Sequence, residues 1–251
     1  MEPLTHKPLV EAIFELRWAI PSQGGLPIDP YYQALIGQLY GALRSQYPVW
    51  ERLPAADLPE NQAAFMPHHR FRRDAGRWPV VQLGPGVVSV HETDAYRWET
   101  FKPQCKELVR LLFEIYRQAE QNLAIADLSL RYIDADGLRC EDPVGFLSKL
   151  KLSFGFADGL FASGRVLNQP QGLSLNAWHP TMDPKGALRA TFSQGQKDGA
   201  EALIWECHLL SSGDDVPRDP DGIDTWLEAA HETTGEWFAR QIEGELMEIY
   251  R

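Results

Sequence analysis

The residues of this chain that could do chemistry are a few histidines, cysteines, arginines and carboxylates, and their spacing matches no common catalytic signature. The sequence has no G-x-x-x-x-G-K-[ST], G-x-S-x-G or H-E-x-x-H segment. The only local hints of metal ligation are the pair His68 and His69 and the pair Cys207 and His208. Because neighbouring residues in a strand point to opposite faces of a sheet, neither pair can chelate one ion by itself. The sequence therefore predicts no catalytic residue, no metal site and no cofactor.

A single basic run, from His68 to Arg73 with Arg77 close behind, stands out in a chain that is otherwise acidic. The run interleaves an aromatic residue with guanidinium groups, as phosphate-reading surfaces do. The functional interpretation of this run is an anion site for a nucleotide, an RNA end or the acidic surface of a partner. The alternative is the solvated end of a hairpin, whose cations offset nearby acids. The predicted anion-binding residues are His69, Arg70, Arg72, Arg73 and Arg77.

The bulk properties of the chain exclude several classes of protein. The 251 residues carry a formal net charge of -11, so the overall field would repel a phosphate backbone and general nucleic-acid binding is disfavoured. The three cysteines are far apart and lack a C-x-x-C spacing, which favours a reducing, cytoplasmic setting over a disulfide framework or a thiolate zinc site. The sequence has no basic and apolar leader and no 18-residue apolar run, which predicts neither secretion nor membrane insertion.

The elements that must position these residues begin with a strand over Val10 to Trp18, where apolar and polar residues alternate as in a half-buried strand. Asp29 and Pro30 then provide an N-cap and a first helical residue for an amphipathic helix that runs to about Tyr47. A polar loop, three strands and a second helix follow. The ranges expected in this half are 10–18, 29–47, 63–72, 78–83, 87–91 and 99–119.

The second half of the chain shows the same kinds of signal in the same order. Asp142 with Pro143, and Asp219 with Pro220, repeat the capping device at the start of two further helices. The last helix is expected to run unbroken to about Ile249, which is roughly 40 Å at ~1.5 Å per residue. The ranges expected in this half are 128–133, 142–150, 173–179, 188–192, 202–210 and 219–249.

This order of elements predicts an α+β fold with internal pseudo-symmetry. We expect a single domain, residues 1–251, composed of two pseudo-equivalent β-α-β-β-β-α halves, 1–121 and 122–251, although no residue identity relates them. Helices that follow antiparallel strands collect on one face of the sheet, because each apolar stripe needs the same surface to cover. The prediction is one mainly antiparallel sheet with helices packed on one face.

The uncovered face of this sheet is the predicted binding site. Period-two alternation places both signs of charge, two imidazoles and a large aromatic ring on it. A solvated face laced with cross-strand ion pairs, each contributing about 0.2–1 kcal/mol, is the first alternative, and a homodimer interface is the second. The predicted residues are Glu15, Arg17, His91, Arg131, Trp178, Arg189, Glu206 and His208.

Three short motifs, Lys7 to Ala12 (K-P-L-V-E-A), Tyr96 to Phe101 (Y-x-W-E-x-F) and Leu130 to Ile133 (L-R-Y-I), occur in this order. Together they resemble a sporadically distributed prokaryotic family of conserved hypothetical proteins of about this length. The residue after the last motif is Asp134, where that family usually has Asn. The resemblance implies a bacterial origin, a cytoplasmic location and a place among mobile or antiphage-defence genes, and it carries no established activity. In element order alone, the chain also resembles the saddle of the TATA-box-binding protein, but its acidic balance argues against binding DNA.

The function that these features favour is a non-catalytic binding protein for a protein partner or a small anionic ligand, as the neutralising or sensing member of a bacterial defence or toxin-antitoxin system. The main alternative is an enzyme or binder acting on nucleotides or nucleic acid. In that case Arg17, Arg131 and the basic run would hold phosphate, while His91 or His208 transfers protons. A structural homo-oligomer that pairs through the uncovered face is the third hypothesis.

Overall fold

The computed structural model of the chain describes residues 4–24, 26–93, 95–137, 143–167 and 172–251. These residues form eleven strands, nine of which build one sheet. The strands are β1 Leu9–Trp18, β2 Ser22–Gln23, β3 Leu26–Pro27, β4 Val49–Arg52, β5 His69–Arg72, β6 Val80–Gly84, β7 Val87–Glu92, β8 Ile125–Asp136, β9 Ser174–Met182, β10 Lys185–Lys197 and β11 Ala200–Ser212.

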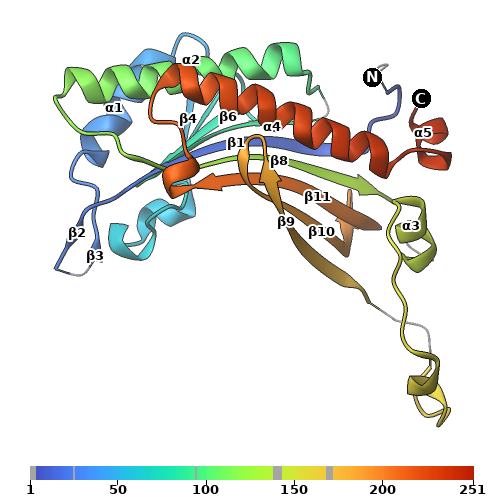
Figure 1. Cartoon of the computed structure of the whole chain (residues 1–251). Helices are drawn as coiled ribbons and strands as arrows, with labels where there is room; N and C mark the ends of the chain where they lie inside the picture. The colour runs from blue at the N-terminus through green and yellow to red at the C-terminus, as the bar shows by residue number, and fades with distance from the viewer. Residues whose placement is uncertain (1–3, 25, 94, 138–142, 168–171) are drawn as a thin grey trace.

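The large sheet is antiparallel throughout and has the strand order β4-β5-β6-β7-β1-β8-β11-β10-β9 (Figure 1). Its central strands, β1 and β8, pair with each other, so the sheet continues without a break from the first half of the chain into the second. The strands β2 and β3 form a separate two-stranded ribbon. The predicted α+β fold with one antiparallel sheet is confirmed.

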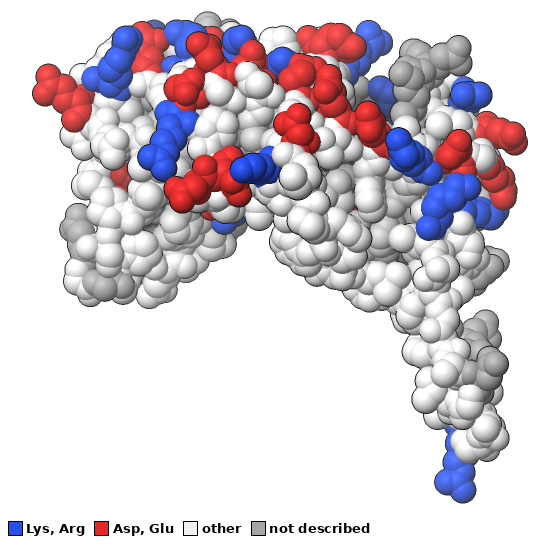
Figure 2. Space-filling view, viewed as in Figure 1, with Lys and Arg blue, Asp and Glu red and all other residues white. Residues whose placement is uncertain are grey.

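Five α-helices accompany the sheet within the described residues: α1 Tyr32–Leu43, α2 Trp98–Gln118, α3 Pro143–Lys149, α4 Pro220–Gln241 and α5 Glu245–Tyr250. Short 3-10 helices occur at Pro54–Asp57, Glu60–Gln62, Asp158–Phe161 and Gly213–Asp215. None of the helices in the described ranges has both the length and the hydropathy that crossing a bilayer requires. Figure 2 shows that charged side chains gather over the helical layer.

The long helices α1, α2 and α4 lie along one face of the sheet, as Figure 1 shows. The residues of the strands that alternate toward this face are apolar and buried, among them Phe14, Leu130 and Leu209. They share one core cluster with buried residues of the helices, such as Phe101 and Trp226. Burying each large apolar side chain stabilises this packing by about 1.5–3 kcal/mol.

The core is divided into two clusters. The larger one combines α1, α2 and the first turns of α4 with strands from both halves of the chain. The smaller one lies where α3, α5 and the end of α4 cover β10 and β11, and it includes Phe146, Phe192, Trp205 and Ile242. Because the larger cluster takes Leu130 and Leu209 from the second half, the core crosses the proposed boundary at residue 122.

Two details of the predicted helices differ from the structure. The last helix is broken into α4 and α5, because Gly244 adopts a left-handed conformation with φ of +100° that an α-helix cannot continue through. The helix α1 begins at Tyr32, and the carboxylate of Asp29 instead accepts hydrogen bonds from the backbone N–H of Tyr31 and the indole of Trp18, each at 3.0 Å. At α4, by contrast, Asp219 is the predicted N-cap and accepts from the N–H of Gly222 at 2.9 Å.

The sheet also contains a strand that the sequence did not predict. Residues 49–52 form β4, which pairs with β5 at the edge of the sheet. The first half therefore contributes five strands to the sheet and the second half four. The predicted cap at Asp142 lies outside the described residues. The pseudo-equivalence of the two halves, and the single domain that they would form, stay predictions.

Candidate functional site

The cross-strand registers place all eight residues of the predicted binding face on the side of the sheet away from the helices. Six strands contribute one row across this open face, through the paired positions His91, Ile13, Arg131, His208, Arg189 and Trp178. Glu15 and Arg17 lie further along β1 with the same alternation, and Glu206 lies two residues before His208 in β11. We call this whole side of the sheet, away from the helices, the open face.

A hollow of about 270 Å³ lies within the open face. Five of the eight predicted residues line it, together with three neighbours from β8 and β11. The lining residues are Glu15, Arg17, Trp178, Arg189 and His208, with Asp127, Ser129 and Leu210. The hollow therefore combines two guanidinium groups, two carboxylates, one imidazole and one indole.

Most charges on the open face are matched by a neighbour. Arg131 donates two hydrogen bonds to Glu206, from Nε at 3.0 Å and from Nη2 at 2.7 Å. Nε of Arg17 donates to Glu15 at 2.7 Å. Bidentate pairing holds the guanidinium of Arg131 in one orientation, so it is less available to a ligand than an unpaired arginine would be.

His91 lies at the far end of the same row, away from the hollow. Its Nδ1 lies 2.7 Å from Oε1 of Glu11, and its Nε2 lies 2.9 Å from Oγ of Ser89. Both ring nitrogens are therefore already engaged within the sheet.

Arg189 differs from the other arginines of the open face. Its Nε donates to the side-chain oxygen of Asn176 at 3.2 Å, and its guanidinium carbon lies 5.4 Å from the centroid of the Trp178 ring. It forms no ion pair with a carboxylate among the described residues. Arg189 therefore keeps the capacity to hold an anion, with Trp178 as the adjoining apolar surface.

His208 is held neutral within the row. Burial, together with the positive charges of Arg131 and Arg189, lowers the pKa of its imidazole to about 4. Its Nε2 is buried without a hydrogen-bond partner in the described structure. A neutral, enclosed imidazole is a poor proton carrier near neutral pH.

The structure does not bring the five residues of the basic run together. Arg70 and Arg72 lie on the open face, and both approach Glu51 of β4, at 3.6 and 2.9 Å. Nη1 of Arg72 also donates to the backbone oxygen of Arg77, and its guanidinium lies 5.5 Å from the Trp78 ring. These contacts match the alternative of a hairpin end that offsets a nearby acid.

The remaining members of the run point elsewhere. His69 lies on the helix face, where its Nδ1 accepts from the indole of Trp50 at 3.0 Å, and burial lowers its pKa to about 4. Arg73 lies over the ring of Tyr47, 5.8 Å from its centroid. Because strand alternation separates His69 from Arg70 and Arg72, the five residues do not form one anion site.

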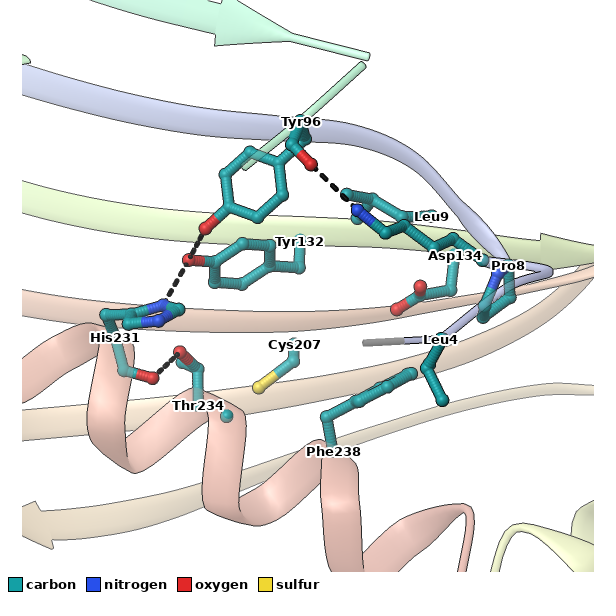
Figure 3. A pocket seen from close by; sticks show the side chains of 12 residues that line it. Leu4, Pro8, Leu9, Tyr96, Tyr132, Asp134, Cys207, His231, Thr234 and Phe238 are labelled. Atoms are coloured by element: carbon teal, nitrogen blue, oxygen red, sulfur yellow. Dashed lines mark hydrogen bonds between the residues drawn. The ribbon is translucent and has the colours of Figure 1, made fainter. Parts of the chain in front are cut away.

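A second cavity, of about 240 Å³, lies on the helix face of the sheet beneath α4 (Figure 3). Its walls come from the N-terminal segment, from β8 and β11, from α4 and from Tyr96 ahead of α2. The lining residues are Leu4, Lys7, Pro8, Leu9, Tyr96, Tyr132, Asp134, Cys207, His231, Thr234, Gly235 and Phe238. Segments of all three motifs that carry the family resemblance meet at this cavity.

Most polar groups around this cavity bond to one another. The hydroxyl groups of Tyr96 and Tyr132 are 2.8 Å apart, and that of Tyr132 lies 2.9 Å from Nδ1 of His231 (Figure 3). The ring of His231 stacks on Trp98 at 3.8 Å between centroids. Burial lowers the pKa of His231 and raises the pKa of both tyrosines. The three hydrogen-bonded side chains, Tyr96, Tyr132 and His231, are therefore uncharged near neutral pH.

Asp134 is the exception in this cavity. It is only 2% exposed, and its carboxyl group has no hydrogen-bond or ion-pair partner within the described part of the chain. Burial raises its pKa to about 8, while the positive charge of Lys197, whose Nζ donates to the backbone oxygen of Ala135 at 3.2 Å, acts in the opposite direction. Figure 3 shows its side chain pointing into the space between Leu9, Pro8 and Cys207.

The predicted site residues do not include this cavity, although the sequence carries one signal for it. Leu128, Leu130 and Tyr132 lie on the helix face, and the same alternation continued by two residues puts Asp134 on that face as well. A carboxyl at an inward position of a strand is a sign of a buried acid. The roles of Tyr96 and His231 could not be found this way, because they approach from separate helical regions.

Comparisons with known proteins add no name to either site. No protein-family model and no curated protein matches this chain. Within the described residues, no group of three or more His, Cys, Asp or Glu side chains is placed to hold a metal ion.

Proposed function

We propose that this protein is a non-catalytic binding protein that holds a partner protein against the open face of its sheet. The observation that carries this proposal is Trp178, which is 53% exposed at the edge of the hollow and lies against Arg189. Exposed tryptophan and arginine side chains are the residues that most often contribute the largest share of binding energy at protein interfaces.

A projecting arm, residues 150–167, supports a partner larger than a small molecule. Figure 1 shows this segment extending away from the body beyond the sheet, and Figure 2 shows few charged side chains on it. The rings of Phe154, Phe156 and Phe161 contact one another at 4.9 and 5.6 Å between centroids. Leu160 and Val166 are exposed by more than 60%. Apolar side chains exposed together in this way are typical of an interaction surface.

The chemistry of the partner follows from the groups that the open face leaves available. Arg189 would take a carboxylate of the partner, while Trp178 and the arm would cover apolar side chains. Arg17 and Arg131 are already paired with Glu15 and Glu206. They would therefore contribute to the shape of the binding surface and little positive charge for the partner. The partner is thus a protein surface that presents an acidic side chain beside apolar ones.

The same contacts favour binding over catalysis on nucleotides. The nucleotide hypothesis requires Arg131 to be available to phosphate and His208 to exchange a proton. Arg131 is held in a bidentate pair with Glu206, and the low pKa of His208 keeps it neutral. A cytoplasmic setting and a place in a bacterial defence or toxin-antitoxin system remain part of the proposal through the cysteine usage and the family resemblance alone.

The test is affinity capture of the intact chain from cells of the natural host, compared between the wild type, W178A/R189A and R240A. Arg240 lies exposed on α4, so R240A removes one arginine from the opposite side of the molecule. We expect a stoichiometric protein partner with the wild type and with R240A, and a binding constant at least tenfold weaker with W178A/R189A.

Three results would contradict the proposal. These are a partner that binds W178A/R189A as well as the wild type, retention of a nucleotide without any protein, and retention of only a second copy of the chain. The last result would favour the homo-oligomer hypothesis, and light scattering of the purified chain would measure it directly.

A further inference from the structure

The cavity beneath α4 is large enough for a small organic molecule. Its volume of about 240 Å³ exceeds the roughly 150 Å³ of an apolar protein cavity that takes up benzene. Apolar atoms make up most of its wall, and the rings of Tyr132 and Phe238 lie on two of its sides (Figure 3). At Gly235, in α4, a Cβ atom would meet no other atom within 4 Å, so the space next to the helix is open.

One polar group in this cavity lacks a counterpart. The carboxyl of Asp134 is nearly inaccessible to solvent and faces the cavity, and it has no partner within the described residues. A buried carboxylate that is neither paired nor hydrogen-bonded destabilises a protein strongly. A ligand that supplies the missing partner would remove much of this penalty.

Most of the other polar groups of the cavity are already hydrogen-bonded. Tyr96, Tyr132 and His231 form one hydrogen-bonded chain. Nζ of Lys7 donates to the backbone oxygen of Tyr96 at 2.9 Å, and the hydroxyl of Thr234 donates to the backbone oxygen of Ala230 at 2.7 Å. A ligand would therefore find one acceptor without a partner, surrounded by apolar and aromatic walls.

We propose that this cavity binds a small organic ammonium ion, with the charged nitrogen at Asp134 and the apolar part of the ligand between Tyr132 and Phe238. The carboxylate supplies the opposite charge, and the aromatic rings add cation–π attraction. The net charge of -11 also draws cations toward the protein. This site lies on the other side of the sheet from the open face and does not depend on the proposed partner.

The experiment measures binding of benzylammonium by calorimetry at a pH just above 8, where more than half of the Asp134 carboxyl is ionised. Benzyl alcohol and toluene are the neutral probes of similar shape. The proteins are the full-length wild type, D134N, G235L and E232Q. Glu232 is exposed on α4, so E232Q removes the same charge as D134N without changing the cavity.

We expect the wild type and E232Q to bind benzylammonium at least tenfold more tightly than benzyl alcohol. D134N should lose that preference and still bind toluene, which shows that its cavity is intact. G235L keeps Asp134 but fills the cavity, so it should bind none of the probes.

Equal binding of benzylammonium by D134N and the wild type would overturn the proposal, as would a preference of the wild type for benzyl alcohol. Unchanged binding by G235L would place the ligand elsewhere and would also overturn it. Circular dichroism of each variant confirms that the chain is folded. None of these results depends on the partner that the open face is proposed to hold.

Discussion

The two faces of the sheet give two charged residues of strand β8, Arg131 and Asp134, different surroundings. On the open face, Arg131 meets Glu206 in a bidentate pair across the neighbouring strand. On the helix face, Asp134 is buried without a partner in the described structure. Paired charges on an accessible face cost little, whereas a lone carboxyl under a helix is costly. A ligand that pairs with the buried carboxyl of Asp134 would therefore stabilise the protein more than one that binds the already paired charges of the open face.

Two titratable residues, Asp134 on the helix face and His208 on the open face, give stability opposite pH dependences. Asp134 has a folded pKa raised to about 8, so the unfolded chain releases its proton first and stability falls as the pH rises from about 4 to about 8. His208 has a folded pKa lowered to about 4, so stability falls as the pH drops from about 6.5 to about 4. Asp134 therefore lowers stability as the pH rises, and His208 lowers it as the pH falls.

The largest expected difference between the faces concerns two tryptophans. Trp205 is 1% exposed on the helix face, and Trp178 is 53% exposed on the open face. W205A should lower the free energy of unfolding by about 3–5 kcal/mol, because it leaves a large void in the core. W178A should change it by less than about 0.5 kcal/mol. Urea denaturation of both variants measures this, and similar losses for the two would contradict the division into a covered and an open face.

Removing the carboxyl of Asp134 should remove its contribution to the pH dependence of the free energy of unfolding. D134N eliminates the titrating group, so we expect the variant to lose a slope of about 1.4 kcal/mol per pH unit between pH 5 and 7 and to be more stable than the wild type near pH 7. Urea denaturation across this range measures the slope. E232Q is the matched control for the loss of one acid. A D134N variant with the wild-type slope would show that Asp134 is ionised in the folded protein.

On the open face, His208 should have a smaller effect on the free energy of unfolding, and this effect should fall in the acid range. NMR titration should leave the His208 ring signals unchanged between pH 8 and pH 5.5, because burial and the arginines hold its pKa near 4. H208Q should lose less stability than the wild type on acidification from pH 6.5 to pH 4. A midpoint near 6.5 for His208 would indicate that the open face is more solvated than the packing implies.

The smallest expected effect concerns the ion pair of the open face. A double-mutant cycle of R131A and E206A should give a coupling energy of about 0.2–1 kcal/mol, because both side chains are partly exposed. Adding salt should reduce this coupling. A coupling energy of several kcal/mol would mean that the open face is covered in solution, as a partner or a second copy would cover it.

Much of the fold could be predicted from local patterns. The alternation from Val10 to Trp18 identified β1, and the helix expected over 99–119 corresponds to α2. The pattern missed β4, because four residues at the edge of a sheet give too short a signal. It also overran the break at Gly244, because Leu246 continues the apolar stripe of α4 beyond the glycine.

The candidate sites were predictable to different degrees. The eight residues of the open face share that face because side chains alternate along every strand. The basic run failed as one site for the same reason, since His69 and Arg70 point in opposite directions. The arm at residues 150–167 and the cavity beneath α4 gave no pattern of their own.

The sequence by itself determined which side chains share a face of the sheet, because this depends only on the local geometry of an extended chain. Tertiary structure decided which of those side chains found partners. Arg131 meets Glu206 only because β8 pairs with β11, and Asp134 lacks a partner because α4 and the N-terminal segment close over it without supplying one. Strand pairing and helix packing join residues that are distant in the chain, and no local pattern records them.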